Sequence, residues 1–141
     1  MDRQAPGRSP AGPRWKRYGI HWHLFVRRHD LGDRARSAGS AAEVVERYRS
    51  DPPDRVGHAP PEVLGWQRER IREALGDATP EWADGRRQGL DDLDGEWARR
   101  LQSQLDKGLS SFQTVRVSDT RVVDVTAYAI RGRDCDQHQT R

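Results

Sequence analysis

The chain of 141 residues contains one cysteine, no asparagine and only two lysines among its 25 basic residues. A single cysteine excludes an internal disulfide framework and a zinc cluster built on paired cysteines. The scarcity of lysine and asparagine is typical of a GC-rich genome, because the codons for both residues are AT-rich. Arginine is therefore abundant partly through base composition, and a net charge of +3 is weak evidence for nucleic-acid binding.

Long apolar stretches are also absent. No run approaches the roughly 18 apolar residues that span a bilayer, and the opening residues, MDRQAPGRSPAGPRWKR, lack the apolar centre of a secretory signal. We therefore expect a small soluble protein with a cytoplasmic location and no membrane partner. Glycine-rich phosphate loops are missing as well, so no nucleotide cofactor is predicted and the sequence assigns no cofactor at all.

The most informative segment present is residues 17–28, which read RYGIHWHLFVRR and alternate with a period of two. Successive side chains of a strand point to opposite faces, so the pattern predicts a strand with one apolar face. That face carries Tyr18, Ile20, Trp22, Leu24 and Val26, whereas the other carries His21, His23, Phe25 and Arg27.

Helices and then a hairpin are expected after this strand. A capping box predicts a helix that starts at Ser40 and stops at the prolines after Asp51. Further predicted helices run from Pro60 or Pro61 to Gly76 and through the apolar repeat that ends at Gly108. Segments 111–117 and 121–130 are rich in Val and Thr and flank a turn, which predicts a hairpin.

These elements predict an α+β fold with a three-stranded antiparallel sheet. Three or four helices lie between the first strand and the hairpin and pack on one face of the sheet. The predicted organisation is a disordered basic arm at residues 1–16, a single α+β domain at 17–130 and a disordered polar tail at 131–141.

If the first and last strands share a sheet, its polar face carries residue types suited to acid–base chemistry and ligand binding. His21 and His23 are the candidate proton carriers, with Asp124 as the orienting carboxylate and Tyr128 as a nearby phenol. The candidate ligand-binding residues on this face are Phe25, Arg27, Arg116 and Thr126. The leading hypothesis is an accessory protein that binds a small molecule or peptide here, with acid–base catalysis as an option.

Two structural interpretations of this face stay open. It can be an ordinary solvated sheet face, or it can be the interface of a homodimer. The argument for the second is the apolar character that Phe25, Tyr128, Val122 and Ile130 give to the face.

The His-Trp-His trio also resembles the His-hydrophobe-His strand of rolling-circle and relaxase-type nucleases. The resemblance implies that the paired imidazoles hold a divalent metal, with Tyr48 as the nucleophile that attacks DNA and Asp124 as the third ligand. A catalytic zinc ion would use the same pair with Asp124, His58 or Asp30 as the third ligand. No second motif supports a metal, and the sequence therefore assigns none.

An alternative function concerns the basic arm. Arg14, Trp15, Lys16 and Arg17 interleave cations with an aromatic ring, which predicts contacts to nucleic-acid phosphates and bases. The other four tryptophans, Trp22, Trp66, Trp82 and Trp97, are expected in or beside the core. Cys135 lies between two aspartates in the predicted tail and is expected to be a poor nucleophile, because neighbouring negative charge disfavours the thiolate.

Overall fold

The computed structural model describes residues 12–32, 41–79 and 93–135. Its elements confirm the α+β fold. They are α1 (Arg14–Arg17), β1 (Ile20–Asp30), α3 (Ala41–Ser50), β2 (Arg55–Gly57), α4 (Pro60–Gly76), α6 (Glu96–Asp106), β3 (Ser111–Arg116), β4 (Arg121–Arg131) and the 3₁₀ turn η3 (Gly132–Asp134).

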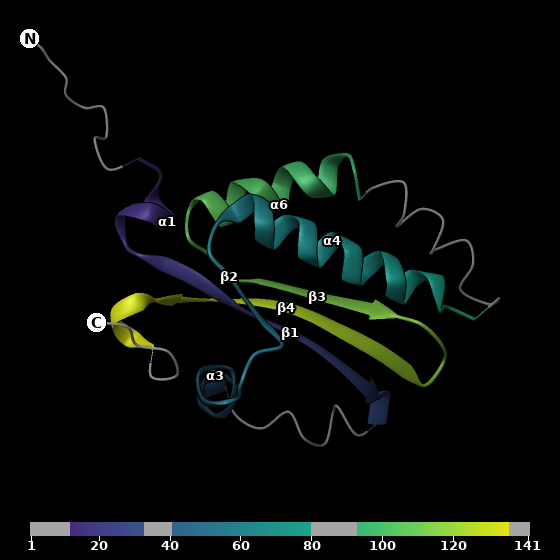
Figure 1. Ribbon diagram of the computed structural model, residues 1–141. Coiled ribbons are helices and arrows are strands. Elements are labelled where there is room, and N and C mark those ends of the chain that lie inside the picture. The colour runs from purple at the N-terminus through teal and green to yellow at the C-terminus, as the bar shows by residue number, and fades with distance from the viewer. Residues whose placement is uncertain (1–11, 33–40, 80–92, 136–141) are drawn as a thin grey trace, which may run out of the picture.

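The sheet is antiparallel throughout, with the strand order β2-β1-β4-β3 (Figure 1). β1 and β4 pair along their full length, from Ile20 opposite Arg131 to Asp30 opposite Arg121. The sequence predicted three strands and missed β2. A strand of three residues that follows two prolines is too short to show an alternating pattern.

Helices α4 and α6 lie side by side on one face of the sheet (Figure 1). The apolar side of β1 faces them, as predicted, and Trp22 also donates a hydrogen bond from Nε1 to the carbonyl of Leu109 at 3.0 Å. Trp66 and Trp97 pack against this core, whereas Trp82 lies outside the described residues. Within the described segments, no helix is long and apolar enough to cross a membrane. The fully buried apolar residues of this layer include Trp22, Leu24, Val63, Leu101, Leu105, Val125 and Ala127.

The opposite face of the sheet is not open, which corrects the expectation of helices on one face only. Helix α3 lies across it (Figure 1), and its Tyr48 ring stacks on Tyr128 at 5.4 Å and meets the edge of Phe25 at 5.2 Å. The Tyr48 hydroxyl lies 3.3 Å from Oγ1 of Thr126. The apolar stripe of α3 predicted that this helix packs on the sheet, but a stripe does not say on which face.

The domain includes more residues than expected on both sides of its predicted bounds, 17–130. Residues 14–17, placed mostly in a disordered arm, form the helical turn α1, and the Trp15 ring lies 5.9 Å from that of Trp22. At the other end Cys135, expected in a disordered tail, is only 2% exposed. In both cases an apolar or weakly polar side chain gains burial against the end of β1.

Candidate functional site

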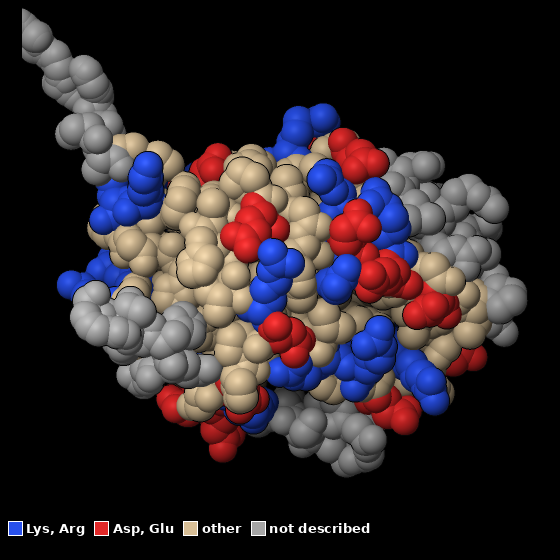
Figure 2. All heavy atoms as spheres, viewed as in Figure 1, with Lys and Arg blue, Asp and Glu red and all other residues tan. Residues whose placement is uncertain are grey.

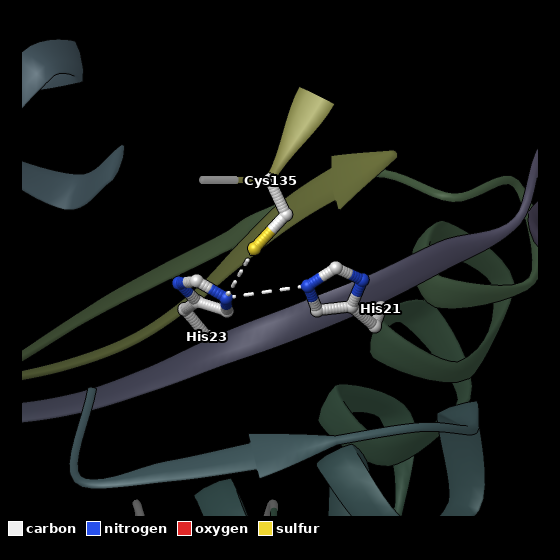
Figure 3. A group of neighbouring side chains, drawn as sticks. All are labelled: His21, His23 and Cys135. Atoms are coloured by element: carbon white, nitrogen blue, oxygen red, sulfur yellow. Dashed lines mark hydrogen bonds between the residues drawn. The ribbon is translucent and has the colours of Figure 1, made fainter. Parts of the chain in front are cut away.

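The candidate site lies where β1 begins and β4 ends. The pleat of β1 directs His21 and His23 to the face opposite α4 and α6, and the strand register sets His23 against Tyr128. Beyond β4 the chain turns back through η3, where the amide of Gly132 donates to the carbonyl of Gly19 at 2.9 Å. This turn carries Cys135 over the two imidazoles (Figure 3).

The three side chains converge on a single atom. His21 Nε2 lies 3.2 Å from His23 Nε2, and Cys135 Sγ lies 3.5 Å from the same His23 nitrogen (Figure 3). One donor atom from each residue lies within 4.8 Å of the others. His23 is 0% exposed, and His21 is half-buried. Two nitrogens and one sulfur are thus gathered in a site largely removed from solvent.

Hydrogen bonding alone does not account well for this convergence. An imidazole nitrogen holds either one proton or one lone pair, directed in the plane of the ring. Nε2 of His23 therefore makes one good hydrogen bond, yet two partners approach it. A cation at the centre removes the competition, because His21, His23 and Cys135 then each direct a lone pair at the ion.

The spacing of the donor atoms suits a tetrahedral ion. With Zn–N of about 2.05 Å and Zn–S of about 2.3 Å, the tetrahedral edges are about 3.3 Å between nitrogens and about 3.5 Å between nitrogen and sulfur. The two measured distances, 3.2 Å and 3.5 Å, agree with these edges to within about 0.2 Å. His21, His23 and Cys135 therefore have the residue types and two of the spacings of a zinc-type centre.

No family model, curated protein or solved structure matches this chain. The functional assignment therefore depends on the chemistry of its own residues.

The candidate residues nearest the imidazole pair form an aromatic cluster instead of an open face. Phe25 and Thr126 are each at least 98% buried, under α3. Tyr128 lies opposite His23 in the strand pairing and stacks on Tyr48, and exposed Phe112 lies 5.9 Å from the Tyr48 ring and 6.5 Å from the Tyr128 ring. The expectation that these groups line an uncovered surface is wrong, because α3 and residues 132–135 cover it.

Asp124 lies too far along the sheet to orient either imidazole of the pair. It is opposite Arg27, four residues from Tyr128, a separation of about 13 Å at about 3.3 Å per residue. Its carboxylate instead accepts a hydrogen bond from Thr114 at 2.8 Å and pairs with Nε2 of His29 at 3.2 Å. The predicted orienting role fails because period-two patterning gives the face of a residue but not its position along the strand.

The two candidate anion-binding arginines also lie towards that far end, and both have local partners. Arg27 pairs with Asp54 at 3.2 Å and lies over the ring of Phe25 at 5.0 Å. Arg116 donates to the carbonyls of Ser118 and Asp119 at 2.9 and 2.7 Å and so braces the β3–β4 turn. Neither contact brings a guanidinium to the imidazole pair.

The third donor, Cys135, is the residue that the sequence analysis missed. Of the predicted alternatives, Asp30 is at the far end of β1 and His58 is exposed just before α4. Tyr48, the nucleophile implied by the nuclease resemblance, does lie over the correct sheet face. Its hydroxyl is hydrogen-bonded to Thr126, however, and its ring is packed among aromatic neighbours. The nuclease hypothesis stays a prediction.

Proposed function

We propose that this protein binds a zinc ion through His21, His23 and Cys135. The observation that carries the proposal is the approach of both His21 Nε2 and Cys135 Sγ to one nitrogen of His23. Burial supports it further, since His23 and Cys135 are at least 98% shielded and a site of this kind excludes competing water.

The donor set favours particular ions. Magnesium and calcium prefer oxygen ligands, and none of these three side chains offers one. Imidazole and thiolate together suit zinc and copper. We commit to zinc because two of the three donor separations fit the edges of a tetrahedron.

Three protein donors would leave a fourth position on the ion. This arrangement is typical of catalytic zinc, where water or substrate fills that position. The ligand-binding function expected from the sequence then takes a specific form, in which the small molecule or peptide contacts the metal at the half-buried His21 edge. Metal binding also occupies Nε2 of both imidazoles, so it excludes the alternative in which these nitrogens carry protons.

Metal titration of the full chain tests the proposal. The purified protein is stripped with a chelator and titrated with Zn²⁺, and with Co²⁺ as a coloured substitute that reports thiolate ligation through charge-transfer absorption. One ion should bind per chain, and at a free zinc concentration of 100 times Kd the unfolding free energy should rise by about 2.7 kcal/mol.

Variants make the test residue-specific. Cys135→Ser and His21→Ala should weaken zinc binding by roughly a hundredfold or more, since even changes in groups that support a ligand cost about 10- to 100-fold. His58→Ala is the matched control, because it removes an exposed imidazole outside the site. Absence of a 1:1 zinc complex, or equal losses in the control, would overturn the proposal. Tight copper binding without zinc binding would assign copper to the site in place of zinc.

A homodimer remains a separate proposal of the sequence analysis. Of the four residues that suggested it, Phe25, Val122 and Ile130 are buried within the chain and Tyr128 is half-buried. What supports a second copy now is the exposed Phe112 on the edge strand β3. Sedimentation velocity of wild type and Phe112→Ser tests it: a dimer that dissociates in the variant supports the interface, and a monomeric wild type refutes it.

A further inference from the structure

A second group of functional side chains lies at the same end of the sheet but on its helical side. There α1, the residues that follow α6 and the last residue of β4 border an open pocket of about 370 Å³. This volume falls within the range of about 300–1,000 Å³ that is usual for small-molecule sites. The polar side chains that line it are Arg14, Tyr18, Lys107 and Arg131.

The pocket is strongly cationic. The guanidinium carbons of Arg131, Arg14 and Arg17 lie 4.5, 5.7 and 5.8 Å from the centre of the Tyr18 ring. Arg17 lies beside the pocket and does not line it, so Arg14, Arg131 and Lys107 are its three lining cations, and no carboxylate lies among the described residues that line it. Blue side chains accordingly mark the surface over α1 at the left edge of Figure 2.

This concentration of charge is unfavourable without an anion. Each exposed cation–π contact contributes only about 0.5–1 kcal/mol, while the like charges of the lining cations repel one another. The nearest acidic neighbour in sequence, Asp106, accepts a hydrogen bond from Gln102 at 2.9 Å on α6. A bound anion would relieve the repulsion directly.

The backbone that carries these side chains is held in place. Gly108 has φ +79°, and a Cβ there would lie 3.2 Å from Ile20 and 3.4 Å from the Cα of Trp15. This close approach joins the end of α6 to α1, and the Gly132–Gly19 hydrogen bond joins α1 to the end of β4. The cations therefore project from a preformed frame, which lowers the entropy cost of binding.

We propose that this pocket binds the phosphate groups of a small phosphorylated molecule. Guanidinium groups match phosphate oxygens with paired hydrogen bonds, and an ammonium adds a point charge. The cations converge around one ring, whereas a nucleic-acid strand needs them spaced along its backbone. Trp15 also packs against Trp22, so it is not a free surface for stacking bases.

Calorimetric titration of the full chain with inorganic phosphate and with pyrophosphate, at fixed ionic strength, tests this inference. Pyrophosphate should bind at one site and more tightly than phosphate. Arg131→Gln and Lys107→Gln should each weaken it about tenfold, the usual effect of losing one charged hydrogen bond. Arg99→Gln is the matched control: it removes the same charge from exposed α6 surface and should leave affinity unchanged.

Three other outcomes would contradict the assignment of a phosphate-binding pocket. An equal loss in Arg99→Gln would mean that net charge, not the pocket, binds the anion, and failure of pyrophosphate to bind would overturn the inference. Short single-stranded DNA that binds without being displaced by pyrophosphate would assign these cations to nucleic acid instead. Cys135→Ser should bind pyrophosphate normally, so this inference and the metal proposal fail independently.

Discussion

Removal of the Tyr48 ring should detach α3 from the sheet. The ring contacts Phe25, Tyr128 and Phe112 at centroid distances of 5.2, 5.4 and 5.9 Å. Truncation of a fully buried aromatic side chain costs about 3–5 kcal/mol. Tyr48 is only half-buried, so Tyr48→Ala should lower the unfolding free energy by about 2–3 kcal/mol, less than the cost for a fully buried ring.

Tyr48→Phe separates the ring from its hydroxyl. The phenylalanine keeps all three ring contacts and loses only the hydrogen bond to Thr126, so the expected cost is about 1 kcal/mol. Val45→Ala is the control on the same helix: Val45 is 41% exposed, and surface changes of this kind cost under about 0.5 kcal/mol.

Urea unfolding gives the three stabilities, and amide hydrogen exchange reports which segment opens. Tyr48→Ala should accelerate exchange in α3 and also in the turn after β4, because Arg49 donates to the carbonyl of Asp134 at 3.2 Å. Equal losses in the Ala and Phe variants would refute the reasoning, since the ring contacts would then contribute nothing. Tyr48→Phe also removes the nucleophile implied by the nuclease resemblance, so any DNA cleavage that survives this change excludes that function.

Three further predictions concern packing, and urea unfolding measures each of them. A Cβ at Gly57 would lie 2.6 Å from Cγ2 of fully buried Val63, so Gly57→Ala should cost about 1–3 kcal/mol. The control is Gly65→Ala, because a Cβ at Gly65 meets nothing within 4 Å. This control substitution should stabilise α4 by about 0.5–1 kcal/mol. Gln67 is a buried residue of α4 and donates from Nε2 to main-chain carbonyls of β3 and β4 at 3.2 and 3.1 Å. Gln67→Leu should therefore cost about 1–3 kcal/mol, and an unchanged stability would contradict this bridging role. Gly108→Ala forces a side chain into φ +79° and should cost about 1–2 kcal/mol.

Much of the fold was predictable because its signals are local. The alternation along residues 17–28 assigned both faces of β1 correctly, and proline and glycine marked both ends of α4. The hairpin of β3 and β4 followed from two β-branched segments around a polar turn. Each of these inferences needs only neighbours in sequence.

The position of α3 was not predictable in the same way. Its stripe shows that one side is buried, yet either face of the sheet can bury it. The choice depends on aromatic partners contributed by three strands, among them Phe25, Phe112 and Tyr128. Those partners meet only after the sheet has formed, so no local pattern contains the information.

The candidate metal centre also depends on information that no local pattern contains, namely the register between β1 and β4. Because Ile20 lies opposite Arg131 in an antiparallel pair, the chain that leaves β4 returns beside the first residues of β1. Cys135, four residues later, can then reach His21 and His23 but not His29, which lies at the other end of the strand. A register slip of two residues would move the imidazoles by about 7 Å relative to β4, and the thiol would no longer approach the shared nitrogen. Both imidazoles were visible in the sequence, whereas the third donor follows from strand pairing alone.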